Sequence, residues 1–407
     1  MISIVVKIDA KYLTTPDKIG KMAKRLIDEK KFGRNVVAVV PSTDLLNDNL
    51  QKLAYSLSDQ PSERELDVLD STNSLIASSL LSIAIQKRGF KAVSLAGWQL
   101  GVETRAVGNN TRIEDLNGDT IIEHFKKGEI VIVAGGQGVD HKNNISVLGD
   151  GGAETMAVAI AEKIHADRVE IYTDRDGVYT ADPTIVESAR KLKDITYDEM
   201  LELAYLGSKI VHPRAVELAK KFGINIVVRS STEDVRGTII KGEVEMEKNL
   251  IVRGVAYETD IVRLTVGYDT YQNSSLANLF NTLADHKVNV DIIVQAVIDN
   301  VKPTVSFSID KEELANTIKV LEEHKEELGF SFADFEVGLA KVSIVGSGMV
   351  SNPGVAARMF DRLQKEHILV KMISTSEIKV SVVVPQDDMV KAANALHDEF
   401  NLVEEYV

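Results

Sequence analysis

The sequence predicts an α/β protein in which a three-layer domain with a mainly parallel sheet precedes two ferredoxin-like domains. Two observations support this prediction: short β-branched runs alternate with helical stretches up to about residue 240, and an apolar pattern that starts at Leu279 recurs at Met359. The chain has 407 residues and a mass of 44.7 kDa, which exceeds what one hydrophobic core usually serves. We therefore expect two or three domains.

Five runs in the first part of the chain read as strands buried on both faces, because they are apolar without alternation. They are Ile2–Ile8, Val36–Val40, Glu129–Ala134, Val169–Tyr172 and Ile224–Val228. Helical periodicity begins at Pro16 in "PDKIGKMAKRLIDEK" and is expected again in Glu65–Lys87 and His212–Phe222. Strands that alternate with helices form parallel sheets, whose ligands bind at the carboxyl ends of the strands. Functional motifs are expected at those ends.

A change of pattern at "KGEVEMEKN", Lys241–Asn249, indicates a domain boundary or a solvated connector. An internal duplication follows it. Its matching positions are Leu279, Phe280, Leu283, Val288, Val290 and Ile293 in the first copy and Met359, Phe360, Leu363, Ile368, Val370 and Ile373 in the second. Each copy reads strand, helix, strand, strand, helix, as in small ferredoxin-like sandwiches. In the second copy these elements are expected at Ala340–Val345, Val355–Glu366, Leu369–Ile373, Ile378–Val384 and Asp387–Phe400.

Charge and composition exclude several classes of function. Lys and Arg total 47 against 61 Asp and Glu, a formal charge of −14, which argues against nucleic acid as a partner. The chain has no cysteine and its eight histidines are scattered, so we expect neither disulfides nor a metal site built by side chains. The apolar runs are strand-sized, and the N-terminal one is too short for a secretory signal. We expect a cytoplasmic protein with no membrane contact.

The stretch "SVLGDGGAETMAV", residues 146–158, is typical of a phosphate-binding loop, because three glycines come directly before the start of a helix. Helix N-termini and glycine amides favour anions. This loop nevertheless contains two anions of its own, Asp150 and Glu154.

Longer motifs resemble those of one protein family. They are "DITYDEMLELAYLGSKIVHPRAVELAKKFGINIVVRSS" (194–231), "GTII", "NLIVRG", "KVSIVGSGMVSNPGVAARMF" and "ISTSEIKVSVVV". With them the chain resembles the single-function bacterial aspartokinases over nearly its whole length. The resemblance implies an amino-acid-kinase-like domain at 1–245 and two ACT domains at 246–335 and 336–407. It also implies ATP with Mg²⁺, phosphorylation of the aspartate side chain, and feedback by lysine, threonine or both.

The loops that carry the chemistry in this family depart from its pattern here. Lys7 remains as the phosphate lysine, but Asp9 and Ala10 replace two glycines beside it. Position 74, where the family has a substrate-holding glutamate, is Ser74 in "STNS". Asp150 replaces an arginine that grips a substrate carboxylate, and Glu154 replaces a catalytic aspartate. We expect Asp150 to repel aspartate and the activity to be weak or lost.

The nucleotide side matches the family better. In "YTDRDGVYTADP" and "GSK" the resemblance assigns nucleotide binding to Tyr172, Thr173, Asp174, Gly177, Val178, Tyr179 and Lys209. Without the resemblance, Asp174 and Gly177 read as an ordinary turn after a strand, and Lys7 as a solvated lysine.

Effector binding is expected in the second half of the chain. The candidates are Asp291 and Gln295 in the first copy and Asn352, Pro353, Gly354 and Val355 at a helix start in the second. The alternative is that these residues only cap helices. By analogy, ACT domains pair across chains, so a homodimer is expected. Met246 could also serve as an internal start that yields the regulatory half alone.

Three interpretations stay open at this point. The chain is a degenerate aspartokinase that senses an amino acid and acts with an active aspartokinase, an active aspartokinase with a rearranged site, or a kinase for another acceptor. In the third case Asp150 and Glu154 would hold a cationic group.

Overall fold

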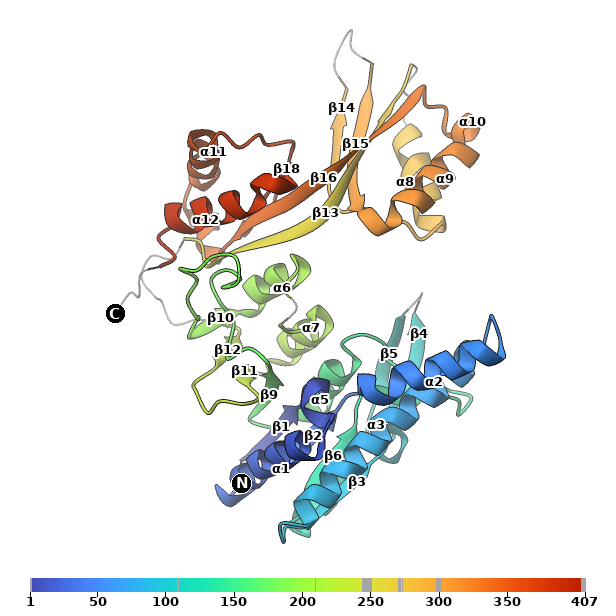
Figure 1. Cartoon of the computed structure of the whole chain (residues 1–407), viewed down its shortest axis with the longest axis vertical. Coiled ribbons are helices and arrows are strands. Elements are labelled where there is room, and N and C mark those ends of the chain that lie inside the picture. The colour runs from blue at the N-terminus through green and yellow to red at the C-terminus, as the bar shows by residue number, and fades with distance from the viewer. Residues whose placement is uncertain are drawn as a thin grey trace. The chain divides into compact units, whose positions relative to one another are not determined.

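The computed structural model describes residues 2–107, 110–208, 210–243, 251–269, 272, 274–297 and 302–403. Contacts divide the chain into two compact units (Figure 1). The first comprises Met1–Val178 and Lys191–Met246, and the second comprises Tyr179–Arg190 and Glu247–Val407. The excursion Tyr179–Arg190 was not predicted, because nothing in its local pattern differs from the segments around it.

A mainly parallel sheet of eight strands forms the centre of the first unit, in the order β10-β12-β11-β9-β1-β2-β6-β3. Only the pair β11 and β12 is antiparallel. The strands are β1 (Ser3–Lys7), β2 (Asn35–Val40), β3 (Ala92–Leu95), β6 (Ile130–Ala134), β9 (Arg168–Thr173), β10 (Asp194–Thr196), β11 (Ile226–Ser230) and β12 (Thr238–Lys241). All five strands expected in this region are confirmed.

Helices cover both faces of this sheet, which confirms the three-layer α/β prediction. They are α1 (Pro16–Lys31), α2 (Asp44–Leu57), α3 (Glu63–Gln86), α4 (Asp119–Lys126), α5 (Gly152–Lys163), α6 (Tyr197–Tyr205) and α7 (Pro213–Phe222). Helix α1 begins where predicted, because Thr15 accepts a hydrogen bond from the Lys18 amide and Pro16 occupies the first helical position. A smaller sheet, β5-β4-β7-β8, joins β4 (Glu103–Val107), β5 (Asn110–Asp115), β7 (Gln137–Val139) and β8 (Ile145–Val147).

Helix α3 belongs to the hydrophobic core of the first unit. Ala77, Leu81 and Ile85 pack with α1 and with apolar residues of β1, β2 and β6. Within the described residues α3 alone is long and apolar enough to cross a membrane, but a core helix passes the same test. This packing accounts for one face of the helix, whereas Ile76, Leu80 and Ile83 are exposed.

The second unit is built on one antiparallel sheet, in the order β14-β15-β13-β16-β18-β17. Its strands are β13 (Gly254–Gly267), β14 (Ile293–Ala296), β15 (Thr304–Asp310), β16 (Phe332–Val345), β17 (Met372–Thr375) and β18 (Lys379–Pro385). Its helices are α8 (Ser275–Asp285), α9 (Leu314–Glu323), α10 (Lys325–Leu328), α11 (Val355–Lys365) and α12 (Met389–Glu399). Both copies show the predicted order of elements, although β17 begins at Met372 rather than at Leu369.

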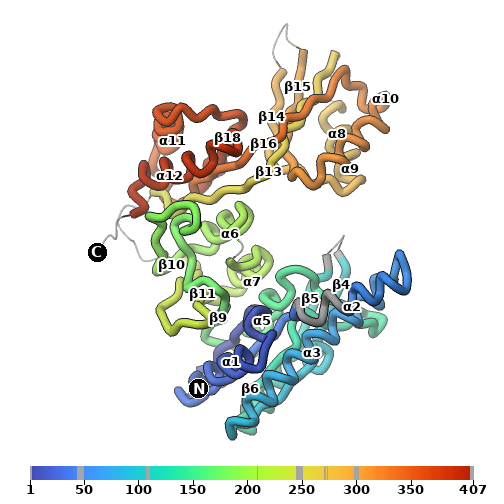
Figure 2. Tube along the Cα trace, viewed as in Figure 1, coloured from blue at the N-terminus to red at the C-terminus, as the bar shows by residue number. Residues whose placement is uncertain are grey.

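Two long strands join the copies, as Figure 2 shows for β13 and β16. The second half of β13, from Ile261, pairs with β15, whereas its first half pairs with the end of β16 beside β18. A register shift between Glu258 and Ile261, where Asp260 has a φ of 59°, separates the halves. The second copy therefore takes its fourth strand from residues that precede the first copy, so the two copies do not simply follow one another along the chain.

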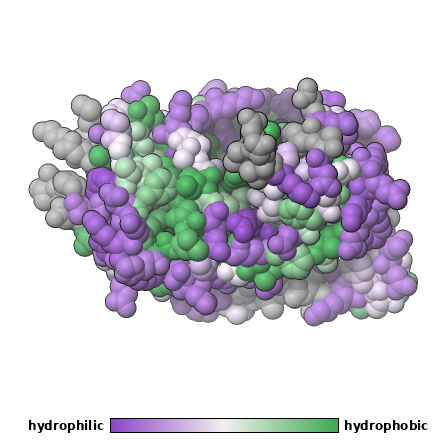
Figure 3. Space-filling view, turned by 90° about the horizontal axis from the view of Figure 1, so that it is seen from above, coloured by the Kyte–Doolittle hydropathy of each residue, from purple (hydrophilic) through white to green (hydrophobic). Residues whose placement is uncertain are grey.

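Each copy has its own core and leaves apolar side chains exposed on the edge strands β14 and β17 and on the central strand β16. Leu264 and Phe307 pack with α8 and α9, and Val342 and Val382 pack with α11 and α12. The exposed apolar residues of the sheet are Ile293, Val294, Phe332, Phe335, Val337 and Ile373. Figure 3, the view from above, shows hydrophobic areas between hydrophilic ones.

His397 ties the excursion Tyr179–Arg190 to α12 inside the second unit. The imidazole is fully buried, with Nε2 2.9 Å from Oγ1 of Thr180 and Nδ1 3.2 Å from Oγ of Ser188. Burial lowers the pKa of His397, and Arg190 lowers it further, whereas Asp398 raises it. The neutral imidazole is thus the form that the fold accommodates.

This burial predicts a stability that falls in mild acid. The unfolded chain binds a proton at His397 near pH 6.5, whereas the folded chain does so only at lower pH. The free energy of unfolding therefore declines as the pH falls from about 6.5 to the folded pKa, by up to ~1.4 kcal/mol per pH unit. His397→Gln should be less stable at pH 7.5 but should show a smaller decline between pH 7 and 5. Urea unfolding at several pH values measures this. Equal declines in the two proteins would contradict it.

Candidate functional site

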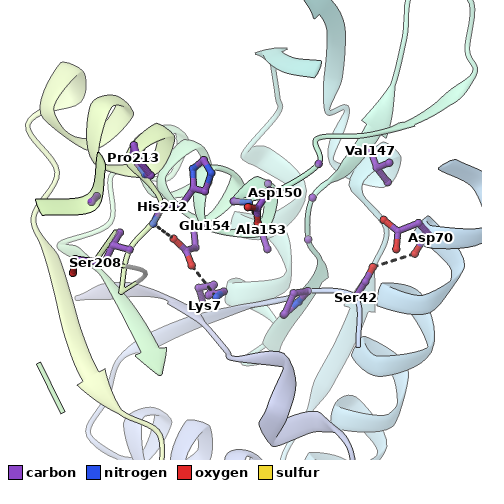
Figure 4. Close-up of a pocket in the computed structure, with 18 residues that line it drawn as sticks. Lys7, Ser42, Asp70, Val147, Asp150, Ala153, Glu154, Ser208, His212 and Pro213 are labelled. Atoms are coloured by element: carbon purple, nitrogen blue, oxygen red, sulfur yellow. Dashed lines mark hydrogen bonds and ion pairs between the residues drawn. The ribbon is translucent and has the colours of Figure 1, made fainter. Parts of the chain in front are cut away.

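A cavity of about 570 Å³ lies in the first unit at the carboxyl ends of β1, β2 and β6. The amino end of α5 and the segment before α7 complete its wall (Figure 4). Its lining residues are Lys7, Pro41, Ser42, Asp70, Gly135, Gly136, Val147, Gly149, Asp150, Gly151, Gly152, Ala153, Glu154, Ala204, Ser208, Val211, His212 and Pro213. A cavity of this size at this edge of a parallel sheet is a typical ligand site.

Lys7 and Glu154 form an ion pair inside the cavity. Nζ of Lys7 lies 2.9 Å from Oε1 of Glu154, and both side chains are largely buried. Oε2 of Glu154 accepts a hydrogen bond of 2.7 Å from the His212 amide. Because Glu154 lies in the first turn of α5, the helix dipole also favours its charge. One of the two anions in the glycine-rich loop is therefore neutralised by the protein itself.

Asp150, the other anion, is exposed at the mouth of the same loop. Its Oδ1 accepts a hydrogen bond of 3.0 Å from the Gly151 amide. The guanidinium of Arg214 holds the loop from outside by donating to the Leu148 carbonyl at 2.8 Å. Since Asp150 is exposed, water weakens any repulsion between it and an aspartate substrate.

Gly151 is required by the geometry of the loop. Its φ is 66°, and a Cβ at this position would lie 2.1 Å from Cγ of His212. A side chain would therefore push the α5 start away from His212.

Ser74 does not line the cavity. It is 1% exposed, its hydroxyl donates to the Ser71 carbonyl at 3.1 Å, and it accepts from Nε2 of Gln137 at 2.6 Å. The hydroxyl is thus engaged inside the first unit. A substrate role for Ser74 stays a prediction that this packing does not favour.

Asp70, Ser42 and His212 line the cavity but were not singled out in the sequence. Asp70 lies on α3 four residues, about one turn, before Ser74, and no motif in the sequence marks it. His212 precedes Pro213 at the start of α7, where its Nδ1 accepts from the Arg214 amide. These residues reach the cavity because separate elements converge at one sheet edge.

Except for Lys209, the residues assigned to the nucleotide lie at the end of β9 or shortly after it, and β9 is the parallel neighbour of β1. Tyr172 is buried with Arg25 over its ring, and Thr173 ends β9. Asp174 accepts from Nζ of Lys11 at 2.8 Å, and this bond lowers the pKa of Asp174. Gly177 and Val178 pack against Thr238, which accepts from the Val178 amide at 2.9 Å.

None of these residues is among the described lining of the cavity, although β9 ends at the same sheet edge as β1. Tyr179 belongs to the second unit. Lys209 and Met246 lie outside the described residues.

The effector candidates lie at two places in the second unit. Asp291 precedes β14 and is held by the buried Lys341, whose Nζ lies 2.5 Å from Oδ2 of Asp291 and also contacts Glu258. Burial lowers the pKa of Lys341, but the two carboxylates outweigh it and the net pKa is raised. Gln295 lies in the edge strand β14 opposite Val305.

The second effector group forms the entry to α11. Nδ2 of Asn352 donates to the Gly348 carbonyl at 2.7 Å. Pro353 follows, Gly354 has a φ of 97° at the helix start, and Val355 is buried as the first helical residue.

The cavity suits a phosphate-bearing ligand. The start of α5, Gly151 to Ala153, lines it beside the ammonium of Lys7, and Gly135 and Gly136 keep this wall free of side chains. The Gly151 and Gly152 amides already donate to Oδ1 of Asp150 and to the Gly149 carbonyl, each at 3.0 Å. A Cβ at Gly135 would lie 2.6 Å from Cγ1 of Val39. In the part of the chain that is described, no group of three His, Cys, Asp or Glu could hold a metal ion. Mg²⁺ would therefore be bound largely through phosphate oxygens and water.

Comparison with known proteins gives consistent matches. The model of the amino acid kinase family matches residues 3–230, and an ACT domain model matches residues 342–400. Aspartokinase 2 of Bacillus subtilis is 50% identical over 98% of both chains. Aspartokinase of Geobacillus stearothermophilus is 46% identical over 99% of this chain and 98% of its own.

Two solved structures are also similar. E. coli aspartokinase III in complex with aspartate and ADP has a TM-score of 0.81 at 21% identity, covering 98% of this chain and 99% of its own. Aspartate kinase from Synechocystis has a TM-score of 0.54 at 35% identity, covering 98% of this chain and 69% of its own.

Proposed function

The chain belongs to the aspartokinase family, and we propose that it phosphorylates aspartate weakly or not at all and acts mainly as an effector-sensing member of that family. The observation that carries this proposal is the charge of the cavity. Asp70, Asp150 and Glu154 contribute three carboxylates, and among the lining residues described, one ammonium, that of Lys7, is already paired with Glu154. L-Aspartate, whose two carboxylates and one ammonium group give it a net charge of −1, meets a net negative site.

ATP with Mg²⁺ is the phosphate donor that the family implies. Lys7 and the start of α5, with the Ala153 amide, would hold the phosphates, and the nucleotide would supply the phosphoryl group that is transferred. The Lys7–Glu154 pair would have to share Lys7 with the phosphates, which further weakens binding. This pairing supports the same proposal.

The formation of aspartyl phosphate by the purified full chain, with ATP, Mg²⁺ and saturating L-aspartate, tests the proposal. We expect turnover far below the ~10 per second typical of enzymes. Turnover at that level would overturn the proposal.

The alternative is an active aspartate kinase with a rearranged site. It is favoured by the intact glycine-rich start of α5 and by Lys7 at the end of β1. A third candidate, a kinase for another amino-acid-like acceptor, is favoured by the unpartnered carboxylate of Asp70.

We also propose an amino-acid effector and a homodimer. E. coli aspartokinase III has been solved in complex with lysine and aspartate, and the ACT match here supports an amino-acid effector, for which the family resemblance implies lysine or threonine. The exposed apolar residues of β14, β16 and β17 support pairing through the second unit, with a second copy or with an active aspartokinase. A cytoplasmic location without membrane or nucleic-acid contact stays a prediction.

A further inference from the structure

The carboxylate of Asp70, a residue that lines the cavity, has one oxygen without a hydrogen-bond partner among the described residues. It lies four residues before Ser74 on α3, so the two residues share one face of the helix. Asp70 lines the cavity, whereas Ser74 is buried and bonded to Gln137. Within the described part of the chain, Oδ1 of Asp70 is buried without a hydrogen-bond partner.

Asp70 as a whole is half-buried, but a carboxylate oxygen that is buried without a partner is costly, because it has lost its hydration. Burial accordingly raises the pKa of Asp70, and Ser42 opposes this to a smaller extent. The Ser42 hydroxyl donates to the main-chain carbonyl of Asp70 at 3.2 Å. Lys7 is held by Glu154, and Figure 4 shows Asp70 beside Ser42, away from that pair. A cation brought by a ligand would supply the missing partner.

The side chains around Asp70 favour an ammonium group over a metal ion as its partner. A divalent metal ion that is held by the protein alone needs several oxygen ligands in a fixed geometry, and the described residues offer no such cluster. A primary ammonium needs only one carboxylate and one or two further acceptors, which Asp70 and the Ser42 hydroxyl provide.

We propose that Asp70 binds the ammonium group of an amino acid held in this cavity, and so replaces the carboxylate that position 74 lacks. The inference rests on the proposed function only in taking the cavity to be the amino-acid site. It requires binding and no turnover.

Isothermal titration of the full chain with L-asparagine and L-aspartate tests the proposal, with succinamate and succinate as the matching ligands that lack the ammonium group. Asp70→Asn should weaken binding of the amino acids at least about tenfold and leave binding of succinamate and succinate unchanged or stronger. Asp70→Ser should give the same pattern. The unliganded Asp70→Asn protein should melt no lower than the parent, because a neutral amide replaces an unpaired charge.

Asp67→Asn is the matched control. Asp67 lies on the same helix, and burial also raises its pKa, but it accepts a hydrogen bond of 3.2 Å from the Val147 amide and does not line the cavity. This variant should bind the amino acids like the parent. Equal amino-acid affinities of the parent and Asp70→Asn, or no binding by the parent at millimolar concentration, would overturn the proposal. Rapid aspartate phosphorylation would instead overturn the proposed function and leave the affinity ratio intact.

Discussion

Asp150→Arg should raise the rate of aspartyl phosphate formation by about a hundredfold. The change moves the local charge by two units, each worth between ~1 kcal/mol in water and ~4 kcal/mol near a protein surface at 4 Å. Because Asp150 is exposed, the lower part of that range applies, and a total near 2.7 kcal/mol corresponds to a factor of 100. Coupled assays of ADP release at varied L-aspartate measure the change.

Two further variants show how much of the rate gain comes from removing the negative charge at position 150 and how much comes from adding a guanidinium group there. Asp150→Asn removes one unit without adding a carboxylate-binding group and should give about a tenfold gain. Glu123→Arg places the same charge change on exposed α4, outside the cavity lining, and should leave the rate unaltered. A parent enzyme that is slowed by Asp150→Arg would instead support the active, rearranged kinase.

Glu170→Ala should lower the free energy of unfolding of the first unit by about 3–5 kcal/mol. Glu170 is fully buried in β9, where it pairs with Arg168 at 2.6 Å and with Arg229 at 3.4 Å and accepts from the Tyr172 hydroxyl. Truncation leaves two partly buried guanidinium groups and a buried hydroxyl without this partner. Urea unfolding measures the loss.

The charge and the shape of Glu170 can be tested separately. Glu170→Gln keeps the volume and part of the hydrogen bonding, so its loss should be smaller, about 1–3 kcal/mol. Lys21→Ala removes the exposed pair with Asp17 on α1 and should change stability by less than about 0.5 kcal/mol. A loss for Glu170→Ala as small as that of Lys21→Ala would show that β9 does not depend on this network.

Most elements were predictable because their signals are local. The apolar runs that became β1, β2, β6 and β9 are buried on both faces, and the caps of α1 and α7 are read from adjacent residues. The exchange of strands between the two copies was not predictable, because pairing of β13 with β16 joins residues about 80 positions apart. No local pattern encodes which strand lies beside which.

Some residues of the candidate site were predicted from the sequence, whereas their contacts were seen only in the structure. Lys7, Asp150 and Glu154 were found in the sequence, and the structure brings all three to one cavity. Their pairing was not foreseen: Glu154 takes Lys7 as its partner, which changes how the anions of the loop act on a ligand. Asp70 gives no motif of its own, since a single carboxylate in a helix is usually a solvated one.

The sequence by itself determined the family, five strands and three helices of the first unit, the order of elements in both copies of the second unit, and the residue types at the glycine-rich loop, because these depend on neighbours along the chain. Only the tertiary structure decided which charges meet, that Ser74 turns inward and Asp70 lines the cavity, and that residues 179–190 join the second unit. The physical reason is that electrostatic energy and desolvation depend on distance and burial, which folding sets between residues far apart in the chain.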